Sequence, residues 1–307
     1  MSAICDTPGC GRPIPKGGEG HPEICPKCLD VLQNRVGAIP LLGGGYIRFI
    51  EDWGYGDAKI AEAGIVEAAR QSTQKGFVDW APYSRCKRCD YIWSYSITAM
   101  PLADCQRPYV EHDWEKHKDG DAGLLRYLHE HTHATPFEFA GMVVEVQAPI
   151  MVFREWHRHR TQSYNEMSAR YARLPTNDYV PTEERCMMVS ATNKQAGAAQ
   201  GSDVLTHEKV IEWLGQLQEA YDVSERVYRN GLQWGIPKEL ARLPIGVGRF
   251  TRMRAHACLR NWLGFMTLRS EKNPNAQWEI RQFGNAVAQL CRDRFPKTMK
   301  LFDGAPK

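Results

Sequence analysis

The stretch that decides the fold reads GMVVEVQAPI (residues 141–150) and continues directly as MVFREWHRHR (residues 151–160). Apolar and polar positions alternate in the first half, which is typical of a half-buried strand. Met142, Val144 and Val146 lie on one side of that strand, and Val143, Glu145 and Gln147 on the other. Proline is tolerated in the first turn of a helix, so Pro149 permits a turn into a helix over Ile150–Arg160. The pattern therefore predicts a strand that leads straight into a helix.

Towards the C-terminus, residues 205–234 place apolar side chains at helical spacing and predict a long amphipathic helix that ends at Gly235 and Pro237. A short helix (237–243), a strand (249–257) and another helix (261–269) follow. Asn273-Pro274 is a suitable cap and first turn for a last helix. The apolar stripe of that helix consists of Ile280, Phe283, Val287 and Leu290.

Towards the N-terminus, YIRFIED (46–52) indicates a strand and residues 58–71 a helix. LLRYLHEH (124–131) predicts a short helix that must end near Pro136, because the residue before a proline avoids the helical region. Residues 76–122 look irregular and aromatic, so we interpret them as an insertion between two elements.

Composition excludes several protein classes. The 307 residues are 43% hydrophobic and 24% charged, which excludes fibrous and wholly disordered proteins. Lys and Arg total 39 against 36 Asp and Glu, and a net charge of +3 is too small to indicate a nucleic-acid or membrane partner. No apolar run approaches the roughly 20 residues of a membrane span, and the N-terminus lacks the apolar core of a signal peptide. We expect a cytoplasmic protein.

Seven of the ten cysteines lie within the first 105 residues of the chain. Cys5, Cys10, Cys25 and Cys28 form two close pairs at about the separation found in a zinc ribbon. Residues 1–40 carry too little apolar periodicity to build a core, so a structural zinc ion would supply their folding energy. We predict a small zinc-binding module over residues 1–40; the alternative is four unbound thiols in a tail.

Cys86-Lys-Arg-Cys89 is less informative, because a lone C-x-x-C motif fits several chemistries. The pair could complete a site with Cys25 and Cys28. It could also form its own site with Cys105 and a histidine such as His112, or be redox-active. The sequence leaves these alternatives open.

The densest chemistry lies in residues 154–171, which contain four arginines and two histidines directly after the predicted strand. Arginine offers a planar fork of donors that suits phosphate, and Ser163 and Ser168 add hydroxyl groups. This composition favours an anionic, phosphorylated ligand; the alternative is a solvated basic face.

The order of these residues is more specific than their charge. Arg158-His-Arg-x-x-Ser-x-Asn-Glu-x-Ser-x-Arg-Tyr171 resembles, without a mismatch, the signature of flavin-dependent thymidylate synthases, the ThyX family. His133-Ala-Thr-Pro-Phe-Glu138 and Ala68-Ala-Arg-x-Ser72 resemble two upstream segments of the same family. Ala241-Arg242, Arg260, Leu268-Arg269 and Ala276–Ile280 follow in the family's order. The resemblance covers roughly residues 46–300.

The resemblance implies the activity and the fold. Such enzymes methylate carbon 5 of dUMP to give dTMP, with 5,10-methylenetetrahydrofolate as the carbon source and a hydride that NADPH supplies through FAD. The implied fold is α+β, with a central antiparallel sheet flanked by long helices, over residues 41–307 and with the insertion at about 76–122. The family also implies a homotetramer whose active sites are built from several subunits, and these expectations leave little room for nucleic acid or a membrane as partners.

Carried over position by position, the resemblance also implies roles for single residues. Arg269 is implied to be the catalytic residue, which polarises the pyrimidine ring and favours negative charge on it. The FAD site is implied to contain Ser72, His133, Thr135, Arg158, His159, Arg160, Glu166 and Arg260. The dUMP site is implied to contain Glu155, Arg158, Glu166, Ser168, Arg170, Arg242 and Arg269, with Arg242 from a different chain than Ser168 and Arg170.

Three positions depart from the family pattern. Glu155 stands where many members carry Gln, and Cys258 and Gly264 stand where many carry Asn near the flavin. Cys258 has only His256 nearby to activate a thiol, so we interpret it as a structural cysteine. The departures keep open a different product, such as a hydroxymethylated pyrimidine nucleotide.

A third hypothesis is a zinc-dependent nucleic-acid-binding protein that has kept a synthase-like domain. Arg249, Arg252, Arg254 and Arg260 would favour it. The zinc segment itself is not conspicuously basic, however, and nucleic-acid binding depends on basic charge near the phosphates.

Overall fold

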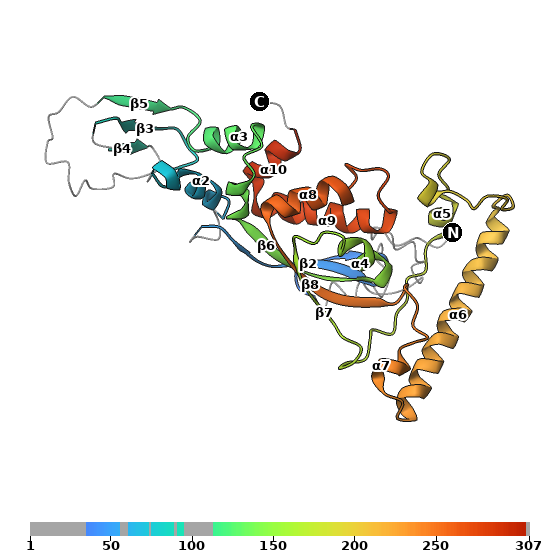
Figure 1. Cartoon of the computed structure of the whole chain (residues 1–307). Helices are drawn as coiled ribbons and strands as arrows, with labels where there is room; N and C mark the ends of the chain where they lie inside the picture. Colours follow the sequence, from blue (N-terminus) through green and yellow to red (C-terminus); the bar gives the residue numbers. More distant parts are fainter. Residues whose placement is uncertain (1–34, 56–60, 74, 89–90, 95–112, 305–307) are drawn as a thin grey trace, which may run out of the picture. The chain divides into compact units, whose positions relative to one another are not determined.

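The computed structural model describes residues 35–55, 61–73, 75–88, 91–94 and 113–304 (Figure 1). They form two compact units. The larger unit contains the described residues through Glu51, together with Val143–Ala257 and Gly264–Gln289. The smaller unit contains the described residues of Asp52–Met142 and of Leu290–Lys307, together with Cys258–Leu263.

A five-stranded sheet is the framework of the larger unit, with strand order β1-β2-β6-β8-β7. Its strands are β1 (Ala38–Leu41), β2 (Gly45–Trp53), β6 (Gly141–Pro149), β8 (Phe250–Cys258) and β7 (Ser163–Glu166). β1 pairs antiparallel with β2, and β7 pairs antiparallel with β8. Beyond the two ends of the β6–β8 pair, Ile150 N donates to Arg249 O and Leu259 N donates to Ala140 O, so these central strands also run antiparallel. The predictions of strands over 46–52, 141–149 and 249–257 are confirmed.

The predicted turn from strand to helix is confirmed at Pro149, where α4 (Ile150–Trp156) begins. Beside the sheet run α8 (Leu259–Arg269) and α9 (Trp278–Arg294) (Figure 1). The ring of Trp156 lies 4.5 Å from that of Phe265 on α8 and 6.3 Å from that of Phe283 on α9, measured between centroids. These aromatic contacts join α4, α8 and α9.

The apolar stripe predicted for the last helix forms the core face of α9. Ile280, Phe283 and Val287 have no exposed surface, and burial of such side chains stabilises the fold by about 1.5–3 kcal/mol each. α9 approaches the end of α8 so closely that a Cβ on Gly284 would lie 2.0 Å from Arg269 O. Glycine at this position therefore permits the contact that holds the end of α8 in place.

The long helix predicted over 205–234 is confirmed as α6 (His207–Gln233), with the Thr206 hydroxyl accepting from Lys209 N at its start. It contacts α5 (Glu183–Met187) and α7 (Lys238–Ala241). Only Val210 and Tyr228 of this helix are buried within the described part of the chain. Ile211 and Val227 are 56% and 50% exposed, so much of the apolar side of α6 faces outward.

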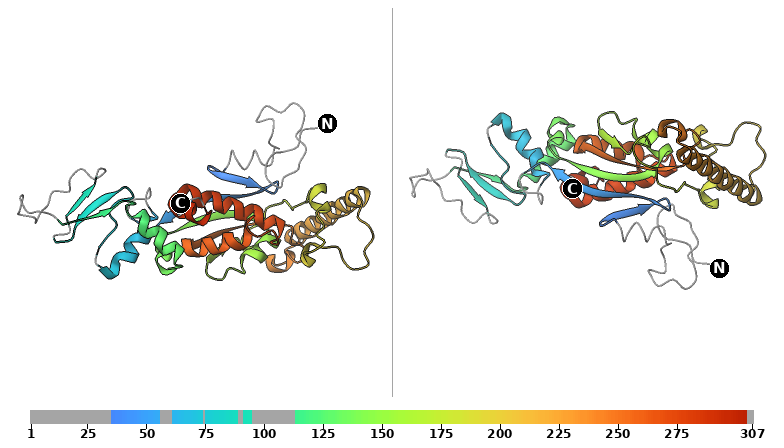
Figure 2. Two further views of the ribbon diagram at one scale, coloured as in Figure 1. Left: turned by 90° about the horizontal axis from the view of Figure 1, so that it is seen from above. Right: turned by 90° about the horizontal axis from the view of Figure 1, so that it is seen from below.

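The smaller unit contains α2 (Ala63–Arg70), α3 (Ala122–Glu130), α10 (Pro296–Phe302) and a second sheet of order β4-β3-β5. These strands are β3 (Tyr83–Cys86), β4 (Ile92–Ser94) and β5 (Trp114–His117), and both of their pairings are antiparallel (Figure 2). The expectation of irregular structure over 76–122 is therefore wrong for the described part of that segment.

A buried carboxylate explains how this small sheet is anchored. Asp121 is fully buried, accepts hydrogen bonds from Val78 N and Tyr83 Oη, and pairs with Arg70 at 2.6 Å. Charge-assisted bonds of this kind are about twice as strong as neutral ones. Asp121 thus joins the segment before β3 and β3 itself to α2, a link between residues up to 51 positions apart that no local pattern reveals.

Other boundaries also differ from the predictions. α2 begins at Ala63, and α9 begins at Trp278 rather than at the predicted Asn273-Pro274 cap. Several short elements escaped prediction because they are too short to show a period. They are β1, β7, α5, α10 and the 3₁₀ turns Gln71–Thr73, Thr135–Glu138 and Lys194–Ala196.

Some predictions cannot be compared with this structure. Cys5, Cys10, Cys25, Cys28, Cys89 and Cys105 all lie outside the described residues, so the zinc module stays a prediction. Where the structure does describe the chain, no three His, Cys, Asp or Glu side chains gather as a metal group. No helix within the same residues is both long enough and apolar enough to cross a membrane.

Candidate functional site

Arg269, the predicted catalytic residue, ends α8 in the larger unit and is held by two groups from the α4 segment. Its Nη1 lies 2.7 Å from Glu155 Oε2, and its Nε donates to His159 Nε2 over 3.1 Å. Only 18% of the Arg269 side chain is exposed, against 38% for Glu155. The two contacts use Nε and one Nη, and thereby orient the guanidinium.

His159 can accept from Arg269 only while Nε2 carries no proton. Desolvation and the nearby charge of Arg269 lower the pKa of His159 from its usual value to about 4. The ring also lies 4.9 Å from that of Phe265, centroid to centroid. His159 is therefore neutral at pH 7 and acts as an acceptor that orients the arginine.

Arg269 and its partner Glu155 line a polar cavity of about 1070 Å³. Four arginines line it: Arg158, Arg185, Arg269 and Arg281. Glu155, the segment Asn273–Trp278 and the polar residues Ser190, Thr192 and Asn193 complete the wall. Arginine forks and amide groups in one concave site suit a phosphorylated ligand, as the sequence predicts.

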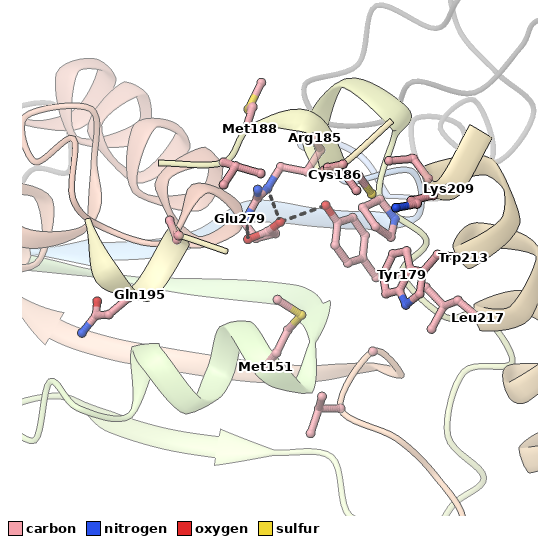
Figure 3. Close-up of a pocket in the computed structure, with 18 of the residues that line it drawn as sticks. Met151, Tyr179, Arg185, Cys186, Met188, Gln195, Lys209, Trp213, Leu217 and Glu279 are labelled. Carbon is pink, nitrogen blue, oxygen red and sulfur yellow. Dashed lines mark hydrogen bonds and ion pairs between the residues drawn. The ribbon is translucent and has the colours of Figure 1, made fainter. Parts of the chain in front are cut away.

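Arg185 was not predicted as a site residue, and it is held by a buried network. Its Nε donates to Glu279 Oε1 at 2.7 Å, and Tyr179 Oη donates to the same oxygen at 3.1 Å (Figure 3). Only 3% of the Glu279 side chain is exposed. Burial, followed by the charge of Glu279, raises the pKa of Tyr179, so its hydroxyl stays a donor.

The same network lines a second, mainly apolar cavity of about 770 Å³. Figure 3 shows Trp213 and Leu217 of α6 on one side of it and Met151 of α4 on another. Arg185, Met188, Gln195 and Ala196 line both cavities. The polar and apolar cavities are thus neighbours that share one wall.

The other residues predicted for dUMP gather elsewhere in the larger unit. Glu166 at the end of β7 and Arg242 after α7 line a smaller cavity of about 280 Å³. Arg170 pairs with Glu239 at 3.3 Å, and Ser168 Oγ accepts from Arg170 N. Within one chain, the predicted dUMP residues therefore form two groups whose cavities have no lining residue in common.

The predicted FAD residues belong partly to each unit. Arg158, His159, Arg160 and Glu166 lie in the larger unit, and Ser72, His133, Thr135 and Arg260 in the smaller one. In the smaller unit, Arg260 forms an ion pair with Glu138, a member of the predicted H-x-T-P-F-E segment. Ser72, His133 and Thr135 are exposed on 3₁₀ turns or next to them.

The donor set of the larger unit fits a flavin dinucleotide. Arg158 and Arg160 are exposed, and neither forms an ion pair with any residue that the structure describes. Two guanidinium groups without ion pairs, two positions apart in the chain, offer the charge and the donors that a pyrophosphate needs. These roles remain predictions for the individual residues.

Cys258 does not have the surroundings of a nucleophile. It ends β8, where burial raises the pKa of its thiol, so the thiolate is disfavoured at pH 7. Gly264 on α8 has open space where a side chain would stand. The interpretation of Cys258 as a structural cysteine agrees with this environment.

Fold and site together define a class: an α+β protein whose arginine-lined cavity suits a phosphorylated ligand. The family model described as "Thymidylate synthase complementing protein" matches residues 59–297. The chain belongs to this family, and the resemblance drawn from the sequence is confirmed.

Individual relatives agree with this membership. A flavin-dependent thymidylate synthase of Thermotoga neapolitana is 34% identical over 187 residues, 61% of this chain and 78% of the relative. One of Thermus thermophilus is 37% identical over 185 residues, 60% of this chain and 64% of the relative.

Two solved structures of the UMP/dUMP methylase PolB from Streptomyces cacaoi are also similar. The one bound with 5-Br UMP has a TM-score of 0.52 at 30% identity, and the match covers 59% of this chain and 81% of that one. The one bound with 5-Br dUMP has a TM-score of 0.58 over 84% of this chain and 94% of that one. At 24% identity, the second match shows the fold alone.

Proposed function

We propose that this protein is a flavin-dependent thymidylate synthase, which converts dUMP to dTMP by reductive methylation. Its carbon donor is 5,10-methylenetetrahydrofolate and its reductant NADPH. The observation that carries the proposal is Arg269, an arginine at the wall of a polar cavity that neutral His159 and Glu155 hold in one orientation. Family membership and the intact Arg158–Tyr171 signature support the same activity.

The chain's own residues would act by binding and by electrostatics. Carbon 5 of the uracil becomes nucleophilic towards the one-carbon unit when negative charge builds up on the ring nitrogen and oxygen atoms. A guanidinium that is already oriented stabilises this charge without reorganisation in the transition state. In the proposal, Arg269 stabilises the charge on the uracil ring. Arg158, which lines the same cavity, binds the phosphate of dUMP.

FAD is the cofactor of the proposed reaction. When bound, it would carry the hydride from NADPH to the transferred carbon. Arg158 and Arg160 would hold its pyrophosphate, and His159 and Glu166 would border it. Ser72, His133, Thr135 and Arg260 are proposed to complete the flavin site.

The absorbance spectrum and the dUMP-dependent oxidation of NADPH by the purified protein test this function. A yellow protein that oxidises NADPH when dUMP is present, and that forms dTMP with methylenetetrahydrofolate, is the expected result. A colourless protein that binds no FAD after reconstitution would refute the proposal. Metal analysis of the same sample tests the zinc module, for which about one zinc ion per chain is expected.

UMP is a second candidate substrate, favoured by the similarity to a UMP/dUMP methylase and by Glu155. A carboxylate only accepts hydrogen bonds, and at this position it could accept from a sugar hydroxyl. A comparison of kcat/KM for dUMP and UMP, with mass spectrometry of both products, decides between the substrates. Mass spectrometry also reveals a hydroxymethylated product.

We propose a homotetramer as the active assembly. The exposed apolar side of α6 needs a partner, and a contiguous apolar surface on a protein commonly marks an interface. The dUMP residues also form two separate groups within one chain, Glu155–Arg158–Arg269 and Glu166–Arg242, and an assembly of several subunits would bring groups of different chains together. We also propose that a domain boundary lies at about residue 40. The proposed location of the protein is the cytoplasm.

A further inference from the structure

Arg281 is a cation in the polar cavity to which the predicted site gives no role. It lies in the first turn of α9 and lines the 1070 Å³ cavity. Its Nε is shielded from solvent and has no hydrogen-bond partner among the described residues. A guanidinium without partners leaves its charge uncompensated, and its terminal Nη groups, rather than the shielded Nε, would be the donors for a ligand in the cavity.

The charges of the cavity separate its four arginines into two kinds. Glu155 neutralises Arg269, and Glu279 neutralises Arg185. Arg158 and Arg281 form no ion pair with any described residue of the chain. In the proposed function Arg158 serves the nucleotide phosphate and the flavin, which leaves Arg281 for another anion.

The size of the cavity leaves room for that anion. Ligand sites for single drug-sized molecules have volumes of about 300–1000 Å³, and this cavity exceeds that range. Its wall near Arg281 is formed by the segment Asn273–Trp278, which joins α8 to α9, and by the indole of Trp278. Two amide side chains fix this wall, because Asn193 Nδ2 donates to Asn275 O and Asn273 Nδ2 donates to Leu268 O.

We propose that Arg281 and the 273–278 segment form a subsite for the anionic tail of a cosubstrate, separate from the groups that hold the nucleotide. This inference rests on the proposed function. Two cosubstrates carry suitable anions, the glutamate carboxylates of the folate and the 2′-phosphate of NADPH. The shared chemistry is a flexible anionic group that forms charge-assisted hydrogen bonds with a guanidinium.

The test compares the wild-type holoenzyme with Arg281→Gln, Arg281→Lys and the control Arg292→Gln. Arg292 lies on the same helix, is half exposed and pairs with Asp303 outside the cavity. The affinities of methylenetetrahydrofolate and of its pentaglutamate, and those of NADPH and NADH, are measured by the quenching of tryptophan fluorescence and as KM. The affinity for dUMP is measured in parallel, and melting temperatures exclude unfolded variants.

Arg281→Gln is expected to weaken the binding of one cosubstrate at least 10-fold, because a hydrogen bond to a charged group contributes about 1.5–3 kcal/mol. The affinity for dUMP and the kcat at saturation should stay within twofold of wild type. Arg281→Lys should restore part of the loss, and Arg292→Gln should change nothing. Loss of the preference for pentaglutamate identifies the folate as the source of the anion, and loss of the preference for NADPH over NADH identifies the 2′-phosphate.

Unchanged affinities for both cosubstrates would overturn the inference, and so would a loss of dUMP affinity as large as the loss for the cosubstrate. The proposed function is tested apart from this by dTMP formation in the wild-type protein. A wild-type enzyme that makes dTMP, with an Arg281→Gln variant that matches it in every affinity, refutes the subsite alone.

Discussion

Helices α9 and α6 carry similar apolar stripes, yet one is buried and the other faces outward. Ile280, Phe283 and Val287 of α9 have no exposed surface, whereas Ile211 and Val227 of α6 are at least half exposed. α9 packs against Trp156 and the end of α8, next to Arg269. The comparison teaches that an amphipathic pattern predicts a contact surface but does not say whether its partner lies in the same chain.

The largest expected effect comes from a charge on the buried stripe. Val287→Asp places a carboxylate where the side chain has no exposure and no cation is provided, a change that commonly costs several kcal/mol. We expect loss of the folded state, measured by circular dichroism and by the yield of soluble protein. Gln289→Asp, on the exposed side of the same helix, is the control. A Val287→Asp variant with wild-type melting would contradict the packing of α9.

The next largest effect is expected on catalysis, at Arg269, which lies at the end of α8 where α9 packs against it. Arg269→Lys keeps the positive charge but loses the fork that contacts Glu155 and His159. We expect kcat to fall about 10²–10³-fold, the range found when one preorganised donor is removed, with little change in melting temperature. Activity within threefold of wild type would show that Arg269 has no special role in the transition state.

On the exposed helix, Val227→Asp should act on assembly. The residue is half exposed within one chain, so the chain should keep its secondary structure while the oligomer dissociates. Light scattering measures the mass, and activity should fall if the sites need several subunits. Arg226→Asp, a neighbouring exposed residue on another face of the helix, is the control. An unchanged mass would exclude this part of α6 as an interface.

A smaller effect is expected at Glu155. Glu155→Gln keeps the shape of the side chain and removes the charge that offsets Arg269. A partly exposed ion pair is worth little in stability, so melting should change by no more than a few degrees. We expect tighter binding of dUMP by a few fold, measured by titration, because the cavity gains net positive charge. Weaker binding would indicate that the carboxylate itself accepts from the nucleotide.

The last effect is a pH dependence carried by His159, which does not act at pH 7. Its pKa is lowered to about 4 in the folded protein and lies near 6.5 in the unfolded chain, so between these values the unfolded chain binds more protons. Its contribution to stability is therefore complete above about pH 6.5 and declines as the pH falls towards 4. Melting temperatures between pH 4 and 7 should depend less on pH in His159→Asn than in wild type. An identical profile would contradict a half-buried, neutral His159.

Residues 141–160 show which parts of the fold can be predicted from neighbouring residues in the sequence. The alternation of Met142, Val144 and Val146 and the position of Pro149 depend on neighbours within a few residues, so strand and helix follow from them. β7 escaped prediction because it is short and mostly exposed, and it forms a strand only by pairing with β8, some 90 residues away. The anchoring of the small sheet also escaped prediction, because Asp121 contacts residues that are far from it in the sequence, such as Tyr83.

By itself, the sequence determined the family, the main strands and helices, and the residue types of the site, because the order Arg158–Tyr171 is specific and periodicity is a local property. Only the tertiary structure decided which of these residues meet. Arg269 reaches His159 across 110 positions and Arg185 reaches Glu279 across 94, and Arg281 lines the same cavity with a shielded nitrogen that is left unsatisfied among the described residues. Such contacts depend on how closely the helices pack, and packing is set by the whole core rather than by any one segment.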